Sequence, residues 1–148
     1  MHRMRTQIDR TALLLHPAPV MFALVNDIES YPAFMDGCVG ADILQRSNDF
    51  VEARLHLAKA GIRQSFTTRN RMTPTSRIDM ELVEGPFERF EGYWLFEALR
   101  PDACKVSLHL SFSMSNSLVG HAVRLLFDGV ADSMVDAMCR RAREIYRV

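Results

Sequence analysis

The chain has 148 residues, of which 48% are hydrophobic, and its 18 basic side chains balance its 18 acidic ones. This length suits a single domain over residues 1–148, and because no apolar run reaches membrane-spanning length, we expect a soluble protein. A formally neutral chain is a poor candidate for binding nucleic acid over its whole surface, although a local basic face is compatible with it.

The N-terminal region shows no targeting signal. Its apolar run, residues 12–15, is too short for a signal peptide, and Asp9 is atypical of a mitochondrial presequence. We therefore expect a cytoplasmic, bacterial protein. Cys38, Cys104 and Cys139 are odd in number and widely spaced, without a CxxC pair or the spacing of a zinc site. We expect three reduced thiols and no metal.

The first elements along the chain are a strand and a helix. Residues 5–15 suit a strand, and Pro17 and Pro19 suit the first turn of a helix that continues through "VMFALVNDI". Pro32 then predicts a corner, because a residue before proline, here Tyr31, is pushed toward extended geometry.

From residue 41 the hydrophobic pattern changes to a period of two. Apolar residues alternate with polar and charged ones, as in a sheet with one buried and one solvent-exposed face. The apolar rows are Val51, Ala53, Leu55 and Leu57; Ile78, Met80 and Leu82; Phe90, Gly92, Trp94 and Phe96; and Val106, Leu108, Leu110, Phe112 and Met114.

Turn signals separate these rows. They fall at residues 47–49, 60–61, 73–76, 84–86 and 100–103, where Gly, Pro, Asn, Asp and Ser gather. Short strands joined by short turns predict an antiparallel meander.

The last segment, residues 117–147, changes to a helical period. A helix of this length would be about 45 Å long and would span a domain of this size. Packed across a curved sheet, it would bury the apolar faces of both elements, which predicts an α+β fold. The apolar positions at helical spacing are Leu118, Ala122, Leu125, Leu126, Val130, Met134, Met138, Ala142 and Ile145.

Four motifs point to a known family: "VNDIESYPAFMDGC", "GIRQSFTTRNRM", "IDMELVEGPFERFEGYWLFEAL" and "GVADSMVDAMCRRA". In this order they resemble the coenzyme Q-binding protein family, which includes the ribosome association toxins of the RatA type and belongs to the START-like, polyketide cyclase/dehydrase superfamily. The resemblance implies a helix-grip (START-like, Bet v 1-like) fold, in which a curved antiparallel sheet wraps around the long C-terminal helix and two short helices follow the first strand. Asp36-Gly37 replaces the Pro-Trp that is usual in relatives, a change that concerns the pocket entrance.

The inward-facing residues are candidates for lining a cavity between sheet and helix. An apolar wall with nine methionines in the chain suits a hydrophobic ligand, although dense core packing gives the same pattern. Tyr31, Pro32, Phe34 and Met35 would form a lip, with Asp27 and Glu29 holding the turn. The equally weighted alternative is that the acids cap or flank a helix end and the aromatics fill core. The candidate ligand-binding residues are Tyr31, Phe34, Met35, Leu55, Leu57, Met80, Leu82, Phe87, Trp94, Phe96, Leu110, Phe112, Met114, Phe127 and Met134.

A second feature is basic. Arg63, Arg69 and Arg71 share one parity, opposite to Phe66 and Met72, and would form a stripe on the outer sheet face. Our preferred interpretation is a cross-strand ladder with the acidic residues of that face. The alternative is contact with ribosomal RNA or anionic lipid headgroups. The acids expected in the ladder are Asp79, Glu81, Glu91 and Glu97.

The sequence lacks the signatures of an enzyme. It has no GxSxG, P-loop or GxGxxG motif, and its five histidines are not spaced as metal ligands. We therefore expect no catalysis and no covalent cofactor, and place a cyclase-like enzyme last.

The resemblance implies that the cavity binds ubiquinone or a similar polyprenyl lipid in support of respiratory electron transport. Contact with the inner membrane would then be transient and peripheral. The alternative implied by the same resemblance is a toxin that binds the large ribosomal subunit and blocks subunit association.

Overall fold

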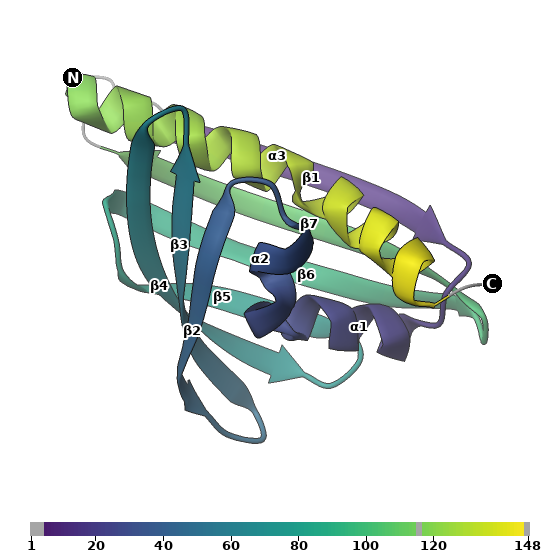
Figure 1. The fold of residues 1–148 in the computed structure, drawn as a ribbon. Helices are drawn as coiled ribbons and strands as arrows, with labels where there is room; N and C mark the ends of the chain where they lie inside the picture. The colour runs from purple at the N-terminus through teal and green to yellow at the C-terminus, as the bar shows by residue number, and fades with distance from the viewer. Residues whose placement is uncertain (1–4, 115–116, 147–148) are drawn as a thin grey trace.

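A computed structural model of the protein describes residues 5–114 and 117–146. Seven antiparallel strands form one sheet in the order β1-β7-β6-β5-β4-β3-β2, and a long helix lies across it (Figure 1). The predicted helix-grip fold is therefore confirmed. The elements are β1 (Arg5–Leu14), α1 (Ala18–Asn26), the 3₁₀ helix η1 (Ile28–Ser30), α2 (Tyr31–Phe34), β2 (Cys38–Arg46), β3 (Phe50–Lys59), β4 (Ile62–Thr73), β5 (Arg77–Glu84), β6 (Phe87–Arg100), β7 (Ala103–Met114) and α3 (Leu118–Ile145).

The strands from β2 to β7 form the predicted meander, and β1 joins its far edge beside β7. The turn between β3 and β4 has Ala60 and Gly61 with φ of 52° and 80°. Two successive residues with positive φ match the right-handed twist of the flanking strands, as in a two-residue hairpin turn. Strand pairing is therefore local along most of the chain.

Between α1 and β2 the chain forms two short helical elements, η1 and α2, where the sequence predicted a corner. Tyr31 has φ −52° and ψ −43°, so the prediction that Pro32 makes it extended was wrong. Pro32 occupies the first turn of α2, where a missing N–H costs nothing, and the Met35 N–H closes this turn on the Tyr31 carbonyl at 2.8 Å. The chain changes direction at Asp27 and Met35 instead, where the helical backbone geometry is interrupted.

Helix α3 begins at a capped end. The Ser117 hydroxyl accepts a hydrogen bond from the Gly120 N–H at 3.0 Å, which satisfies one of the free donors of the first turn. The face that packs on the sheet is continuous from the second turn to the last. Its buried residues are Val123, Leu126, Phe127, Val130, Ala131, Val135, Ala137, Met138 and Ala142.

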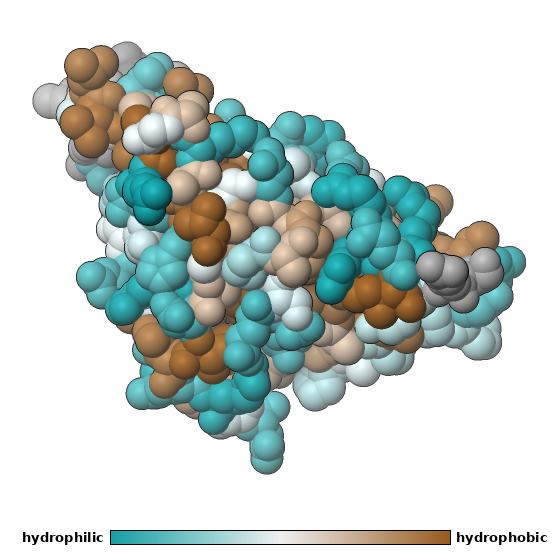
Figure 2. Space-filling model, viewed as in Figure 1, coloured by the Kyte–Doolittle hydropathy of each residue, from teal (hydrophilic) through white to brown (hydrophobic). Residues whose placement is uncertain are grey.

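Three apolar positions predicted for the buried face of α3 are exposed. Leu118, Leu125 and Ile145 expose 89%, 58% and 45% of their surface. With 3.6 residues per turn, Leu125 lies about 200° around the helix from both Val123 and Phe127, so it faces away from the sheet. Figure 2 shows hydrophobic side chains gathered at the start of α3. The helical period was predicted correctly, but the expected burial of these three residues was wrong.

Five phenylalanines join α3 to the sheet. The Phe127 ring lies 4.5 Å from that of Phe87 and 4.9 Å from that of Phe66, both edge to face. Phe90 and Phe112 pack against Phe87 at 5.0 and 5.5 Å. Such pairs add stabilisation beyond that of the buried area alone. This cluster fixes α3 to β4, β6 and β7 at one place in the core.

The loop before β2 lies close against α3. Gly37 has φ of 87°, and a Cβ atom there would lie 2.8 Å from Cγ2 of Val130. The Ala58 N–H donates to the Gly37 carbonyl at 2.9 Å, and the Lys59 ammonium donates to the Asp36 carboxylate at 2.7 Å. A tryptophan at position 37 would collide with α3 in this conformation. Asp36-Gly37 therefore brings the loop closer to the helix than a larger pair would allow.

We predict that Gly37→Ala destabilises the protein more than Gly61→Ala. Both positions have positive φ, which costs an alanine about 1–3 kcal/mol, but nothing lies within 4 Å of a Cβ at Gly61. The clash with Val130 should add about 1–3 kcal/mol for Gly37→Ala. Urea unfolding followed by circular dichroism measures both. Equal losses of unfolding free energy would show that the loop shifts away from α3 freely.

Candidate functional site

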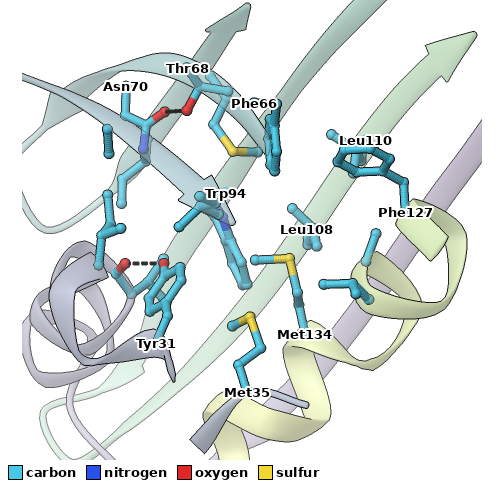
Figure 3. Close-up of a pocket in the computed structure, with 18 of the residues that line it drawn as sticks. Tyr31, Met35, Phe66, Thr68, Asn70, Trp94, Leu108, Leu110, Phe127 and Met134 are labelled. Atoms are coloured by element: carbon cyan, nitrogen blue, oxygen red, sulfur yellow. Dashed lines mark hydrogen bonds between the residues drawn. The ribbon is translucent and has the colours of Figure 1, made fainter. Parts of the chain in front are cut away.

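A cavity lies between the inner face of the sheet and α3, and the segment from α1 to α2 closes one side of it (Figure 3). Its free volume is about 60 Å³. That is several times the space one water needs, but much less than the 300–1,000 Å³ or so of pockets that hold drug-sized ligands. A ligand larger than a few atoms therefore requires the lining side chains to move.

Most of the predicted ligand-binding residues line this cavity. They come from α2 and the residue after it, from strands β3, β5, β6 and β7, and from α3. The inner face of the sheet and the facing sides of the helices therefore enclose the cavity, as predicted. The predicted residues found in the lining are Tyr31, Met35, Leu55, Leu57, Met80, Trp94, Leu110, Phe112, Phe127 and Met134. Their role in binding a ligand remains a prediction.

Five predicted residues do not line the cavity: Phe34, Leu82, Phe87, Phe96 and Met114. Phe34 packs under the Arg141 guanidinium at 5.2 Å, and Phe96 packs edge to face on Phe22 at 5.4 Å. Phe87 belongs to the aromatic cluster, Met114 is buried, and Leu82 is half-buried outside the cavity. The apolar rows are longer than the cavity, so their ends fill core instead.

The lining also contains polar residues that the sequence analysis missed: Asn26, Thr68 and Asn70. The Thr68 hydroxyl donates to Asn70 Oδ1 at 2.9 Å, and both residues are buried. Asn26 Oδ1 is buried without a hydrogen-bond partner among the residues the structure describes. The signal was available for the β4 pair, because Thr68 and Asn70 share the parity of Phe66, which was assigned inward.

No charged side chain lines the cavity. The further apolar residues that the sequence analysis did not select come mainly from helices and from strand centres. They are Val25, Ile28, Ala53, Phe66, Ile78, Phe90, Leu108, Val130 and Ala131.

Tyr31 is a structural part of this wall. Its hydroxyl donates to the Val25 carbonyl, which ties α2 to the end of α1. Burial raises the pKa of the Tyr31 phenol far above its ordinary value, so the group stays neutral. Asp27 and Glu29 are exposed and hold the turn: the Ser30 hydroxyl donates to Asp27 Oδ2 at 2.6 Å, and Arg46 lies 3.4 Å from Glu29. The motif "VNDIESYPAFMDGC" thus supplies one wall of the cavity and the hydrogen bonds that hold this wall in place.

The three arginines of β4 lie on the outer face as predicted. The register places Arg69 opposite Glu81 and Arg71 opposite Asp79, as the ladder requires, but neither pair forms an ion pair. Arg69 pairs with Glu52 of β3 at 3.3 Å and is half-buried. Arg63 and Arg71 are exposed, and within the described part of the chain neither makes an ion pair.

The acids expected in that ladder have other partners or none. Asp79 pairs with Arg77 at 2.9 Å and Glu97 with Lys105 at 3.9 Å, while no ion pair joins Glu81 or Glu91 to another described residue. In the strand register, Glu81 and Asp79 of β5 lie directly opposite Arg69 and Arg71, so a basic row on β4 runs beside an acidic row on β5.

Residues 14–139 match the sequence model of a known protein family, described as "Polyketide cyclase / dehydrase and lipid transport". The chain belongs to this family. The family assignment made from the four motifs is confirmed, and the match covers most of the fold, from the end of β1 to the last third of α3.

Two of the relatives of this chain carry toxin names. It is 43% identical over 143 residues to "Ribosome association toxin RatA" of Pseudomonas aeruginosa, a match covering 97% of the chain and 99% of that protein. It is 44% identical over 140 residues to "Persistence and stress-resistance toxin PasT" of Escherichia coli O6:H1, covering 95% and 89%. A more distant relative, "Coenzyme Q-binding protein COQ10 homolog B, mitochondrial" of Xenopus laevis, is 25% identical over 130 residues and covers 85% of the chain and 53% of that protein.

Solved structures share the fold at low sequence identity. The Zhui aromatase/cyclase from Streptomyces sp. R1128 superposes with a TM-score of 0.83 at 16% identity, covering 97% of this chain and 98% of that one. A START superfamily protein from Mycobacterium smegmatis gives 0.78 at 22% identity, covering 94% and 98%. The fold of this family thus occurs in enzymes as well as in other proteins, so the absence of catalysis remains a prediction.

Two further features of the described residues bear on function. In residues 5–114 and 117–146, no group of three or more His, Cys, Asp or Glu side chains is placed to hold a metal ion. Over the same ranges, no helix combines the length and the apolar character that crossing a membrane requires.

We predict that the cysteines react slowly in the folded protein. Burial raises the pKa of the Cys38, Cys104 and Cys139 thiols, so less of the reactive thiolate is present at pH 8 than for a free thiol. The rate should rise with pH as the thiolate forms. An aromatic disulfide reagent added to native and urea-unfolded protein measures this, with three thiols expected only after unfolding. Rapid labelling of the native protein at pH 8 would contradict it.

Proposed function

We propose that the chain associates with the ribosome, that its partner is the large subunit, and that it thereby blocks subunit association. The observation that carries this proposal is 43% identity to a ribosome association toxin over almost the whole length of both proteins. Identity at this level over nearly the whole of both chains is better explained if the two proteins share a binding partner than if they share only a fold.

The outer face offers a surface suited to ribosomal RNA. Arg63 and Arg71 project from β4 without ion-pair partners among the described residues. Arg54 of β3 lies between them, opposite Thr67, and pairs with Glu84 at 3.9 Å. Unpaired arginines recognise phosphate oxygens with little rearrangement, since no existing pair has to be broken. Association through them would weaken as salt increases, because bound counterions are released from the RNA.

A second candidate function is supported by the cavity. We propose that it binds an amphiphile with an apolar tail, such as a polyprenyl quinone, and the distant relative named as a coenzyme Q-binding protein agrees with this. Met35, Met80 and Met134 line the cavity, and their unbranched side chains can change conformation to enlarge it. Only the head and the nearest part of the tail would be enclosed, because the free volume is small.

We predict that reversing Arg63 and Arg71 to Glu weakens ribosome association by about tenfold or more, since each phosphate contact contributes to affinity and to its salt dependence. Co-sedimentation with purified large subunits over a series of salt concentrations measures both quantities. The matched control is Arg140→Glu with Arg143→Glu, the same charge change on exposed arginines of α3.

Loss of association only in the β4 variant would place the contact on the outer sheet face. Equal losses in both variants would indicate a response to net charge. Failure of the unmodified protein to sediment with large subunits under any salt condition would contradict the proposed partner.

We predict that freshly purified protein carries a prenylated lipid that mass spectrometry of its organic extract will find enriched over an unrelated protein from the same host. Leu55→Arg places a charge in the cavity wall and should abolish the enrichment, while Leu44→Arg, the same change at an exposed position of β2, should preserve it. Circular dichroism checks that both variants fold. A lipid retained equally by both variants would show that it binds outside the cavity.

A further inference from the structure

We infer that the polar residues of the cavity form a head-group site for an uncharged, hydroxyl-bearing head. This inference rests on the proposal that the cavity binds an amphiphile. It adds which end of the cavity receives the ligand's head group and what chemistry that head group must have. The site consists of Asn26, Thr68 and Asn70.

The hydrogen bonds within this group leave defined groups unused. Thr68 and Asn70 expose only 7% and 8% of their surface, and the Thr68 hydroxyl uses its proton on Asn70 Oδ1. Asn70 Nδ2 makes no hydrogen bond to another described residue, and among the polar atoms of the described lining residues Asn26 Oδ1 is the one that is fully buried without a partner. Buried polar groups in native proteins nearly always have partners, so the unpaired Asn26 Oδ1 in a cavity-lining residue indicates a ligand.

The unused groups define what a partner must supply. Asn26 Oδ1 requires a donor, and the Asn70 amide N–H requires an acceptor. A hydroxyl group provides both, since its proton donates and its oxygen accepts. A carbonyl oxygen would satisfy Asn70 but not Asn26, so a quinol or an alcohol complements the site better than a quinone does.

The charge of the head is restricted as well. None of the lining side chains is ionisable as Asp, Glu, Lys, Arg or His, so a carboxylate or phosphate would be buried without a counter-ion. Burying an unpaired charge is far more costly than burying a hydroxyl that finds its partners. Fatty acids and phospholipids are therefore poor ligands for this site.

The position of the site sets the direction of the ligand. Thr68 and Asn70 lie on one side of the cavity, with Leu110 and Phe127 on the other (Figure 3). Along β4, Asn70 and Phe66 are four residues apart, or about 13 Å. The head therefore lies at the end nearer the β4–β5 turn, and the tail runs along the apolar wall toward Phe66 and Phe127.

The test uses four probes with the same ten-carbon tail: a benzoquinol, the corresponding benzoquinone, decan-1-ol and decanoate. Trp94 is the only tryptophan of the chain and lines the cavity, so its fluorescence reports binding in a titration. The dissociation constant, taken from the titration midpoint, is compared rather than the amplitude. We expect the benzoquinol to bind at least tenfold tighter than the benzoquinone, decan-1-ol to bind measurably, and decanoate at pH 8 not to bind.

Asn26→Leu and Asn70→Leu remove the polar groups at similar volume. Asn26→Leu should weaken the benzoquinol about tenfold and change the benzoquinone less than twofold, which removes the preference. Ligand-free Asn26→Leu should unfold at equal or higher urea concentration than the unmodified protein, because an unpaired oxygen has been replaced by an apolar group. Asn70→Leu should unfold at a lower urea concentration, because the buried Thr68 hydroxyl loses its acceptor. Gln45→Leu, at an exposed position of β2, is the matched control and should change neither affinity.

The outcomes separate the two proposals. Equal affinity of the unmodified protein for benzoquinol, benzoquinone and decanoate would overturn the head-group site and leave the cavity proposal standing. A preference for benzoquinol that survives both Asn variants would also overturn the site. Absence of binding for all four probes would overturn both proposals. Binding of decan-1-ol as tight as that of the benzoquinol would support the hydroxyl as the recognised group, and would show that an aliphatic alcohol supplies it as well as a quinol does.

Discussion

The contact between α3 and the inner face of the sheet is the interaction on which the rest of the structure depends. Phe127 anchors it within the aromatic cluster, and at the sheet edge the Arg10 guanidinium of β1 donates to the Asp132 carboxylate of α3. Neither the curved sheet nor the helix can bury its apolar face alone. The cavity lies where the side chains of the two layers do not meet, so the contact that stabilises the fold also determines the space left for a ligand.

The segment from α1 to the start of β2 closes this space and is fastened by its buried apolar residues and by a few polar contacts. The Tyr31 hydroxyl on the Val25 carbonyl, the Lys59–Asp36 pair and the close approach of Gly37 to Val130 hold it in place. Because the free volume is about 60 Å³, a ligand enters only if this segment or the methionine side chains move. Asp36-Gly37 bears directly on that movement, since it sets how closely the loop approaches α3.

The sheet and the long helix followed from sequence periodicity because each element buries one face over many residues. The limits of the cavity did not follow from it. Phe96 and Met114 continue the same inward rows as Trp94 and Phe112, and only the arrangement of α1 and α3 decides which of them faces free space. Tyr31 was misassigned because its helical turn depends on hydrogen bonds that outweigh the local effect of Pro32. The unpaired side-chain oxygen of Asn26 could not be predicted from the sequence, because its lack of a hydrogen-bond donor results from tertiary packing.

Strand β4 connects the two proposed functions. Its alternate residues face opposite sides, so Thr68 and Asn70 point into the cavity while Arg69 and Arg71 lie on the outer face, one residue away. A head group bound to the Asn70 side chain would contact the strand that also carries Arg71. Because a strand in the middle of a sheet is held by neighbours on both edges, such binding would restrict the movement of β4 rather than displace it. A ligand in the cavity would then act on ribosome association by ordering the outer face of the sheet. Ligand binding and ribosome association therefore need not exclude each other.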